Sequence, residues 1–222
     1  MDPLPQSLLF LGIIPALILW FIGLKGYEGY YSDRGAFLAI AFGIIMGLVS
    51  AAVRIIVNPF PYLFTYIVIF AFFDNLLKTM VLNIGRLHNE KKTLIYGLSF
   101  GLGFGSSFTP LLIIAASGTG FADFNSLALI TFGSIGFIFF HAATATFIGY
   151  GIYIGKVFNF LLIAIALQLP FNFIADVARD YNSSYFNLAQ IGLIVFGLII
   201  YYLVITKYMV KIKQDKKRKR SN

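Results

Sequence analysis

The stretch Ala71–Lys92, AFFDNLLKTMVLNIGRLHNEKK, begins like a membrane-spanning helix and then places Asp74, Asn75 and Lys78 inside it. Asp74 and Lys78 are four residues apart, so a helix puts them on one face. An aspartate at mid-bilayer costs roughly 2.5–3.5 kcal/mol on insertion scales, and its short side chain cannot reach the interface. The stretch therefore predicts a helix whose polar face is turned toward other helices rather than toward lipid.

The composition of the whole chain indicates a membrane protein. Of its 222 residues, 59% are hydrophobic and 12% are charged, and the mean hydropathy is +0.85. A helix needs about 20 apolar residues to cross roughly 30 Å of hydrocarbon. Seven stretches are long enough, at 7–24, 36–57, 60–84, 94–117, 127–155, 157–178 and 185–209. We therefore predict an all-α fold, a seven-helix transmembrane bundle over residues 1–209 with a basic cytoplasmic tail at 210–222.

Two further features narrow the class of function. Met1–Gln6 contains no basic residue, so we interpret the first apolar run as a span rather than a cleaved signal peptide. The chain has no cysteine, which excludes disulfides, thiolate catalysis and Cys-ligated metals. Its two histidines, His88 and His141, are too few for a three-histidine zinc site. We expect no metal and no cofactor.

The charges in the predicted loops give the expected orientation. Basic residues gather in every second loop, which the positive-inside rule assigns to the cytoplasm. These loops hold Lys25, Arg34, Arg86, Lys91, Lys92 and Lys156. The sequence therefore predicts an outside N-terminus and a cytoplasmic C-terminus, with the plasma membrane as the expected location. Asn182, in the sequon Asn182-Ser183-Ser184, falls in an outside loop and is a candidate glycosylation site.

The net charge of +8 does not indicate nucleic-acid binding. The tail VKIKQDKKRKRSN, residues 210–222, holds seven Lys and Arg residues and one Asp, so it accounts for six of the eight net charges. Basic residues beside a span are attracted to anionic lipid headgroups by about 1 kcal/mol each. We expect membrane lipids as partners of the tail, and no nucleic acid.

Other predicted spans also place polar residues near mid-depth. Besides the polar residues of 60–84, they hold Ser106, Ser107 and Thr109 in 94–117, His141 and Thr144 in 127–155, and Gln168 and Asn172 in 157–178. Polar residues at one depth in so apolar a chain indicate a shared interior site. We predict one polar cavity lined by Asp74, Asn75, Lys78, His141, Gln168 and Asn172. The alternative is a purely structural Asp–Lys pair.

A second pattern lies in YGLSFGLGFGSS, residues 96–107, where Gly97, Gly101 and Gly105 recur every four residues. Small residues at this spacing let another helix approach backbone to backbone. The glycine ridge therefore predicts either close packing within the bundle or docking of a partner's transmembrane helix.

The order of these motifs resembles the glutamic intramembrane protease superfamily. This superfamily joins PrsW proteases, the CAAX-processing and bacteriocin-processing proteases, and the anterior-pharynx-defective subunit of gamma-secretase. PrsW-like enzymes carry EExxK in one span, FxxxE after a GLGF segment in the next, then a His before a GYG segment, and finally HxxxN. The matching positions here, within about 71–178, are Asp74-Asn75-x-x-Lys78, Phe104-xxx-Phe108, His141 with Gly149-Tyr150-Gly151, and Gln168-xxx-Asn172. The paired glutamates, the second-motif glutamate and the final histidine are replaced.

These replacements decide what the resemblance implies. In such enzymes a glutamate activates water for attack on a peptide bond. Asp74 keeps an acid that is one methylene shorter, and Asn75 cannot act as a base. The gamma-secretase subunit is similar in its seven spans, its outside N-terminus and the GLSFG segment at 97–101, which implies a noncatalytic scaffold for other transmembrane proteins. A divergent protease is the alternative. A transporter or channel is a further alternative, but the sequence shows no internal repeat of the kind that would favour it.

Overall fold

The computed structural model describes residues 10–57, 63–110, 124–178 and 184–210, and within these ranges all regular structure is helical. The long helices are α1 (Phe10–Leu24), α2 (Asp33–Ile56), α3 (Leu63–Leu82), α4 (Lys92–Ser106), α6 (Phe124–Tyr153), α7 (Val157–Val177) and α8 (Phe186–Val204). A short 3₁₀ helix, η2 (Gly85–Leu87), precedes α4, and a π-helical turn, η3 (Ile205–Met209), continues α8. The fold class is all-α.

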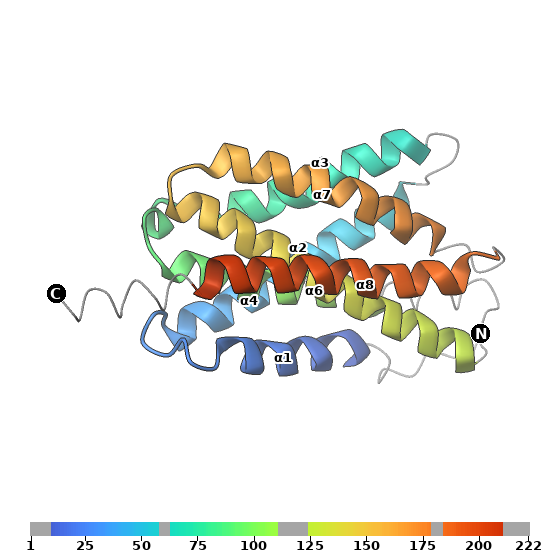
Figure 1. Cartoon of the computed structure of the whole chain (residues 1–222), viewed down its shortest axis with the longest axis horizontal. Helices are drawn as coiled ribbons and strands as arrows, with labels where there is room; N and C mark the ends of the chain where they lie inside the picture. Colours follow the sequence, from blue (N-terminus) through green and yellow to red (C-terminus); the bar gives the residue numbers. More distant parts are fainter. Residues whose placement is uncertain (1–9, 58–62, 111–123, 179–183, 211–222) are drawn as a thin grey trace.

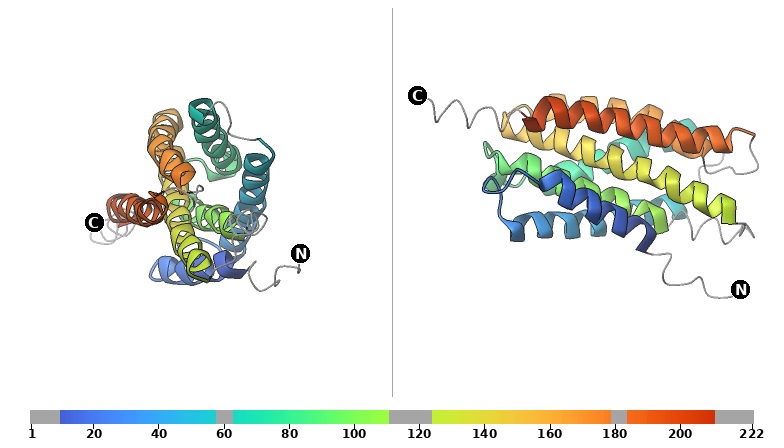
Figure 2. Two further views of the ribbon diagram at one scale, coloured as in Figure 1. Left: turned by 90° about the vertical axis from the view of Figure 1, so that its right-hand side faces the viewer. Right: turned by 60° about the horizontal axis from the view of Figure 1, so that its bottom comes forward.

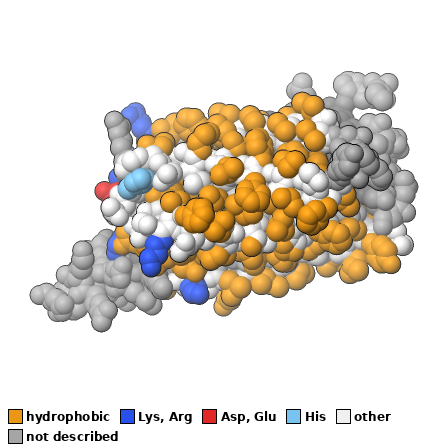
Figure 3. All heavy atoms as spheres, turned by 90° about the horizontal axis from the view of Figure 1, so that it is seen from above, with side chains coloured by type: hydrophobic (Ala, Val, Ile, Leu, Met, Phe, Trp, Pro, Cys, Tyr) orange, Lys and Arg blue, Asp and Glu red, His pale blue; other side chains and the backbone are white. Residues whose placement is uncertain are grey.

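Five of the described helices are long and apolar enough to cross a membrane, namely α2, α3, α6, α7 and α8 together with η3. Their outer faces carry large apolar side chains, and Phe64 on α3 is 78% exposed. Figure 3 shows such side chains covering most of one face of the molecule. Lipid is the solvent in which such a surface is stable. The chain is an integral membrane protein with a helical-bundle fold.

One predicted span differs from the structure. The stretch 94–117 is predicted as one continuous helix, but α4 ends at Ser106, a turn follows at Ser107, and residues 108–110 are helical again; residues 111–117 lie outside the described residues. The hydroxyls of both serines donate to the carbonyl of Gly103, at 2.7 and 3.2 Å. Such side-chain bonds compete with the helical ladder, and they coincide with the end of the helix. Helix α1 has 15 residues, and the start of its predicted span, residues 7–9, lies outside the described residues.

Helix α4 forms the centre of the bundle (Figure 1). Every residue of this helix from Thr93 to Ser106, except Tyr96, is buried. The end-on view of Figure 2 shows α4 enclosed by α1, α2 and α6. Helices α3 and α7 lie side by side at one edge of this core, and α8 packs along α6. The polar residues of α3 and α7 therefore face the core from one side.

The glycine ridge of α4 packs against α6. A Cβ atom added to Gly97, Gly101 or Gly105 would lie 2.6 Å from a backbone atom of α6. No side chain fits into such a contact, so the two backbones touch directly. The packing interpretation of the ridge is confirmed. The interpretation of the same ridge as a docking face for a partner is wrong, because α6 of this chain already covers it.

Candidate functional site

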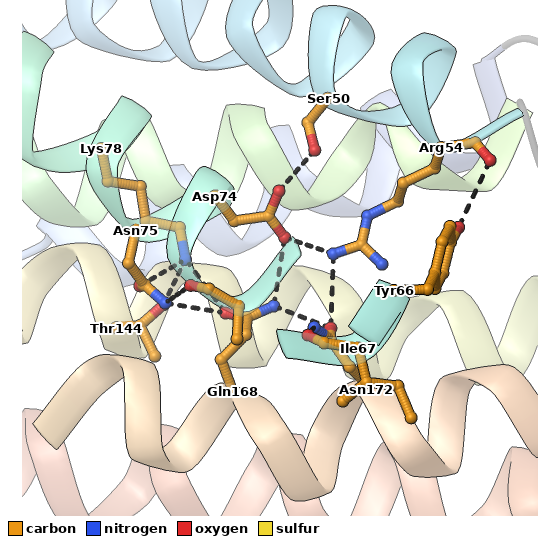
Figure 4. A network of polar contacts seen from close by, with 11 residues as sticks. Ser50, Arg54, Tyr66, Ile67, Asp74, Asn75, Lys78, Thr144, Gln168 and Asn172 are labelled. Carbon is orange, nitrogen blue, oxygen red and sulfur yellow. Dashed lines mark hydrogen bonds and ion pairs between the residues drawn. The ribbon is translucent and has the colours of Figure 1, made fainter. Parts of the chain in front are cut away.

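The structure places Asp74, Asn75 and Lys78 on the buried side of α3, and none of the three has exposed surface. The buried stripe of this helix begins with the apolar residues Tyr66 and Phe70 and then becomes polar. An eight-residue set from α2, α3, α6 and α7, hereafter the polar cluster, meets at this point (Figure 4). Its members are Ser50, Arg54, Asp74, Asn75, Lys78, Thr144, Gln168 and Asn172.

Asp74 is held by three donors from two other helices. One carboxylate oxygen accepts a bond from the hydroxyl of Ser50 on α2. The other accepts from Nη2 of Arg54 at 2.6 Å and from Nε2 of Gln168 on α7 at 3.2 Å. The ion-pair partner of Asp74 is thus Arg54 rather than Lys78. These three donors satisfy the hydrogen-bonding needs of the buried carboxylate, which hydrocarbon lipid chains cannot do.

Arg54 joins three helices. Its Nη2 also donates to Oδ1 of Asn172 at 3.3 Å. The guanidinium carbon lies 4.5 Å from the ring centre of Phe70 and 5.6 Å from that of Phe108, both within cation–π range. Only 12% of its side chain is exposed. Neither Arg54 nor Ser50 is among the residues predicted to line the cavity. The signal was present, because the two residues are four apart on the same face of an apolar helix.

Lys78 is surrounded by neutral oxygens. Its ammonium donates to Oγ1 of Thr144 at 2.9 Å, to Oδ1 of Asn75 at 3.2 Å and to Oε1 of Gln168 at 3.5 Å. An ammonium group has three donors, so these acceptors match its capacity. The ring of Phe104 lies 5.4 Å from Nζ and adds a cation–π contact.

Gln168 connects the two charged regions of the cluster. Its Oε1 accepts from Lys78 and, at 3.4 Å, from Nδ2 of Asn75. Its Nε2 donates to Asp74 and, at 3.1 Å, to Oδ1 of Asn172. Along this route the contacts between Lys78 and Asp74 run through amide groups. Amides do not take up or release protons near neutral pH, so the route cannot act as a proton relay.

His141 does not join the polar cluster, which corrects the prediction of a shared cavity that includes it. Its ring is fully buried, and neither ring nitrogen has a hydrogen-bond partner among the described residues. The ring centre lies 4.8 Å from that of Phe104 and 5.1 Å from that of Phe108, with which it is stacked at 10°. Thr144, one turn further along α6, is the member of that helix that binds the cluster.

The remaining predicted residues lie elsewhere. Ser107 donates to the carbonyl of Ile44 at 2.9 Å and so joins α4 to α2 rather than to the cluster. Ser106 and Ser107 both bond within their own helix turn, and the buried hydroxyl of Thr109 has no partner among the described residues. The glycosylation candidate Asn182 and the tail after Val210 lie outside the described residues.

Comparison with known proteins gives no match: the chain corresponds to no protein-family model, no curated protein and no solved structure. The resemblance to the glutamic intramembrane protease superfamily therefore depends on the motif residues themselves. These residues lie on α3, α4, α6 and α7, and Phe108 lies in the helical residues 108–110 that follow the turn at Ser107. Two of the motif segments, Asp74–Lys78 and Gln168–Asn172, are joined by hydrogen bonds, and the other two meet where Phe104 and Phe108 contact His141.

Proposed function

We propose that this protein is a noncatalytic relative of PrsW and CAAX proteases that binds other membrane proteins as a scaffold. The observation that carries the proposal is the contact between Asn75 and Gln168 at 3.4 Å. These two residues stand where PrsW-like enzymes have a glutamate and a histidine. A general base must accept a proton during catalysis, and an amide cannot. The amide pair preserves polar contact between α3 and α7 without acid–base chemistry.

The environment of Asp74 supports the same conclusion. A carboxylate that activates water needs an oxygen directed at that water. Both oxygens of Asp74 already accept bonds from Ser50, Arg54 or Gln168. Arg54 also holds the carboxylate in a buried ion pair. Asp74 is therefore suited to joining helices, and poorly suited to moving a proton.

The proposed scaffold has seven spans, an outside N-terminus and a cytoplasmic C-terminus in the plasma membrane. The gathering of basic residues at one end of the bundle supports this orientation. Because the glycine ridge is covered, partner helices contact the lipid-facing sides of the bundle. Partners are other transmembrane proteins or peptides.

A divergent intramembrane protease is the second candidate. The observation that favours it is His141, whose two ring nitrogens are buried without a partner among the described residues. Unpaired buried groups of this kind occur at catalytic sites. Asp74 keeps the acid that such an enzyme needs. A proton-coupled transporter is less favoured, because amides separate Lys78 from Asp74 along the route through Gln168.

Restoring the family motif tests the loss of catalysis. We would reconstitute the wild-type protein and an Asp74→Glu/Asn75→Glu/Phe108→Glu/Gln168→His variant in bilayers with a library of transmembrane peptides. Phe108→Glu places a carboxylate beside His141, because the two native rings are stacked. We expect product from the restored variant only. The matched control adds His141→Ala to that variant and should remove the product.

Partner binding needs a separate test. A photoreactive residue at Phe64 on α3 or Phe158 on α7, both exposed to lipid, should cross-link to a discrete transmembrane partner in native membranes. The same residue at the buried position Phe100 should cross-link only within the chain. Lipid adducts alone from the exposed positions of α1, α2, α3, α6, α7 and α8 would contradict a scaffold.

A further inference from the structure

Among the described residues, the exposed charged side chains lie at one end of the bundle. This is the end where α1, α3, α6 and α8 finish and where α2, α4 and α7 begin. Its described basic side chains are Lys25, Arg34, Lys91, Lys92, Lys156 and Lys207, and its described acidic ones are Glu28, Asp33 and Glu90. On the face that Figure 3 shows, the described Lys and Arg side chains lie near this end, and apolar side chains are spread along the described surface beyond it.

Three of these lysines are close in sequence to residues that pack together near the C-terminal end of α8, and we call them the basic rim: Lys25, Lys156 and Lys207. Tyr208 of η3 packs 4.6 Å from Tyr150 of α6, measured between ring centres. Lys207 precedes Tyr208, and Lys156 lies in the turn that follows α6. Lys25 follows the last residue of α1, which belongs to the same buried cluster as these tyrosines. All three lysines are therefore within a few residues of one hydrophobic cluster, although they come from separate segments.

No described acidic side chain pairs with the basic rim. All three side chains are exposed, and none forms an ion pair among the described residues. The nearby acids have other contacts: Glu90 lies 3.9 Å from Lys92, and Glu28 accepts a bond from the backbone of Gly26 at 2.8 Å. An ammonium group has three donors, which suit the oxygens of a phosphate.

The position of the rim indicates which phosphate it meets. Tyrosines are typical of the membrane–water interface, where the ring is apolar and the hydroxyl is hydrated. Tyr150, Tyr153 and Tyr208 lie beside the rim, and the helices on the other side of them expose apolar side chains. A lysine at this depth contacts lipid headgroups, and anionic headgroups attract it.

We propose that the basic rim binds the headgroups of anionic phospholipids, independently of the basic tail at 211–222. The partner is a lipid surface rather than a nucleic acid or an acidic protein. The rim then concentrates anionic lipid around the ends of α1 and α8, because charge attraction acts on the lipids that already surround the bundle.

The single tryptophan of the chain, Trp20 on α1, provides a local probe, since it lies five residues before Lys25. The full-length protein would be placed in bilayers of phosphatidylcholine and phosphatidylglycerol, with bromine on the acyl chains of one lipid at a time. Quenching of Trp20 by each brominated lipid reports which lipid is beside α1. We expect phosphatidylglycerol to be preferred, with the preference falling as salt rises.

The decisive variant is Lys25→Gln/Lys156→Gln/Lys207→Gln, and the matched control is Lys213→Gln/Lys216→Gln/Lys217→Gln, which removes the same charge from the tail. Each rim lysine is expected to contribute up to about fivefold. The rim variant should lose the preference at Trp20, and the control should keep it. An unchanged preference in the rim variant, or its loss in the control alone, would overturn the proposal. A soluble acidic peptide or RNA would be added at the same total negative charge as the phosphatidylglycerol. If it abolished the lipid preference at Trp20, the rim would be assigned to that partner instead.

Discussion

The helices around α4 and the pair formed by α3 and α7 are held by different means. Helix α4 touches its neighbours backbone to backbone, as Gly103 does against α2 and Gly101 against α6. Helices α3 and α7 instead contribute Asp74, Lys78 and Gln168 to the polar cluster. Inside a membrane the hydrophobic effect does not drive helices together, so close packing and hydrogen bonding take its place. One chain uses both, in separate regions.

This difference predicts different sensitivities. A backbone contact has no room for an added methyl group, whereas a polar contact accepts a change of size but not the loss of a charge partner. Substitutions in the two regions should therefore change the free energy of unfolding by different amounts.

The largest effect should come from Asp74→Ala. This change leaves the guanidinium of Arg54 buried without its carboxylate, and breaking a buried pair in this way costs about 3–5 kcal/mol. Unfolding by a denaturing detergent, followed by circular dichroism, measures the free energy. The double variant Arg54→Met/Asp74→Ala should recover most of the loss, because both charges are removed. Equal losses in the single and double variants would show that charge pairing does not hold α3 to α2.

An intermediate effect is expected from Gly101→Ala. The new Cβ would lie 2.6 Å from Cα of Ala142, and the backbone there cannot yield as a side chain does. Overpacking of this kind costs about 1–3 kcal/mol. Gly192→Ala on α8 is the matched control, since its Cβ would meet only Ile174 at 3.4 Å. The same unfolding experiment should separate the two, and equal stability would contradict direct backbone contact between α4 and α6.

The smallest effect should appear between Asn75 and Gln168. A double-mutant cycle with Asn75→Leu and Gln168→Leu measures the coupling of the two amides. Interhelical hydrogen bonds in membranes average about 0.6 kcal/mol, and we expect a value near this. A coupling of zero would mean that the two amides do not bond, and would remove the contact on which the proposed function depends.

Part of this arrangement could be predicted from sequence. The burial of the polar face of α3 could be predicted from the cost of placing Asp74 in lipid. The close packing of the glycine ridge could be predicted from the four-residue spacing of its glycines. Arg54 was missed because its position near the end of α2 concealed how far its long side chain reaches. His141 was grouped with the polar residues by depth alone. Its environment depends on Phe104 and Phe108, which only the packing of α4 against α6 brings beside it.

The break in α4 was missed for a local reason. Hydropathy continues past residue 106, so a window average extends the helix. The structure interrupts the helix at Ser107, where the hydroxyls of Ser106 and Ser107 bond to the carbonyl of Gly103, and residues 108–110 are helical again. A window average does not see such bonds.

Cleavage of the transmembrane-peptide library by the wild-type protein in bilayers would show whether the polar cluster catalyses or only joins helices. We predict that the wild-type protein forms no product beyond that of the folded Arg54→Met/Asp74→Ala variant, which lacks the carboxylate. Product that the wild type forms and this variant does not would contradict this prediction and identify a divergent protease that uses Asp74.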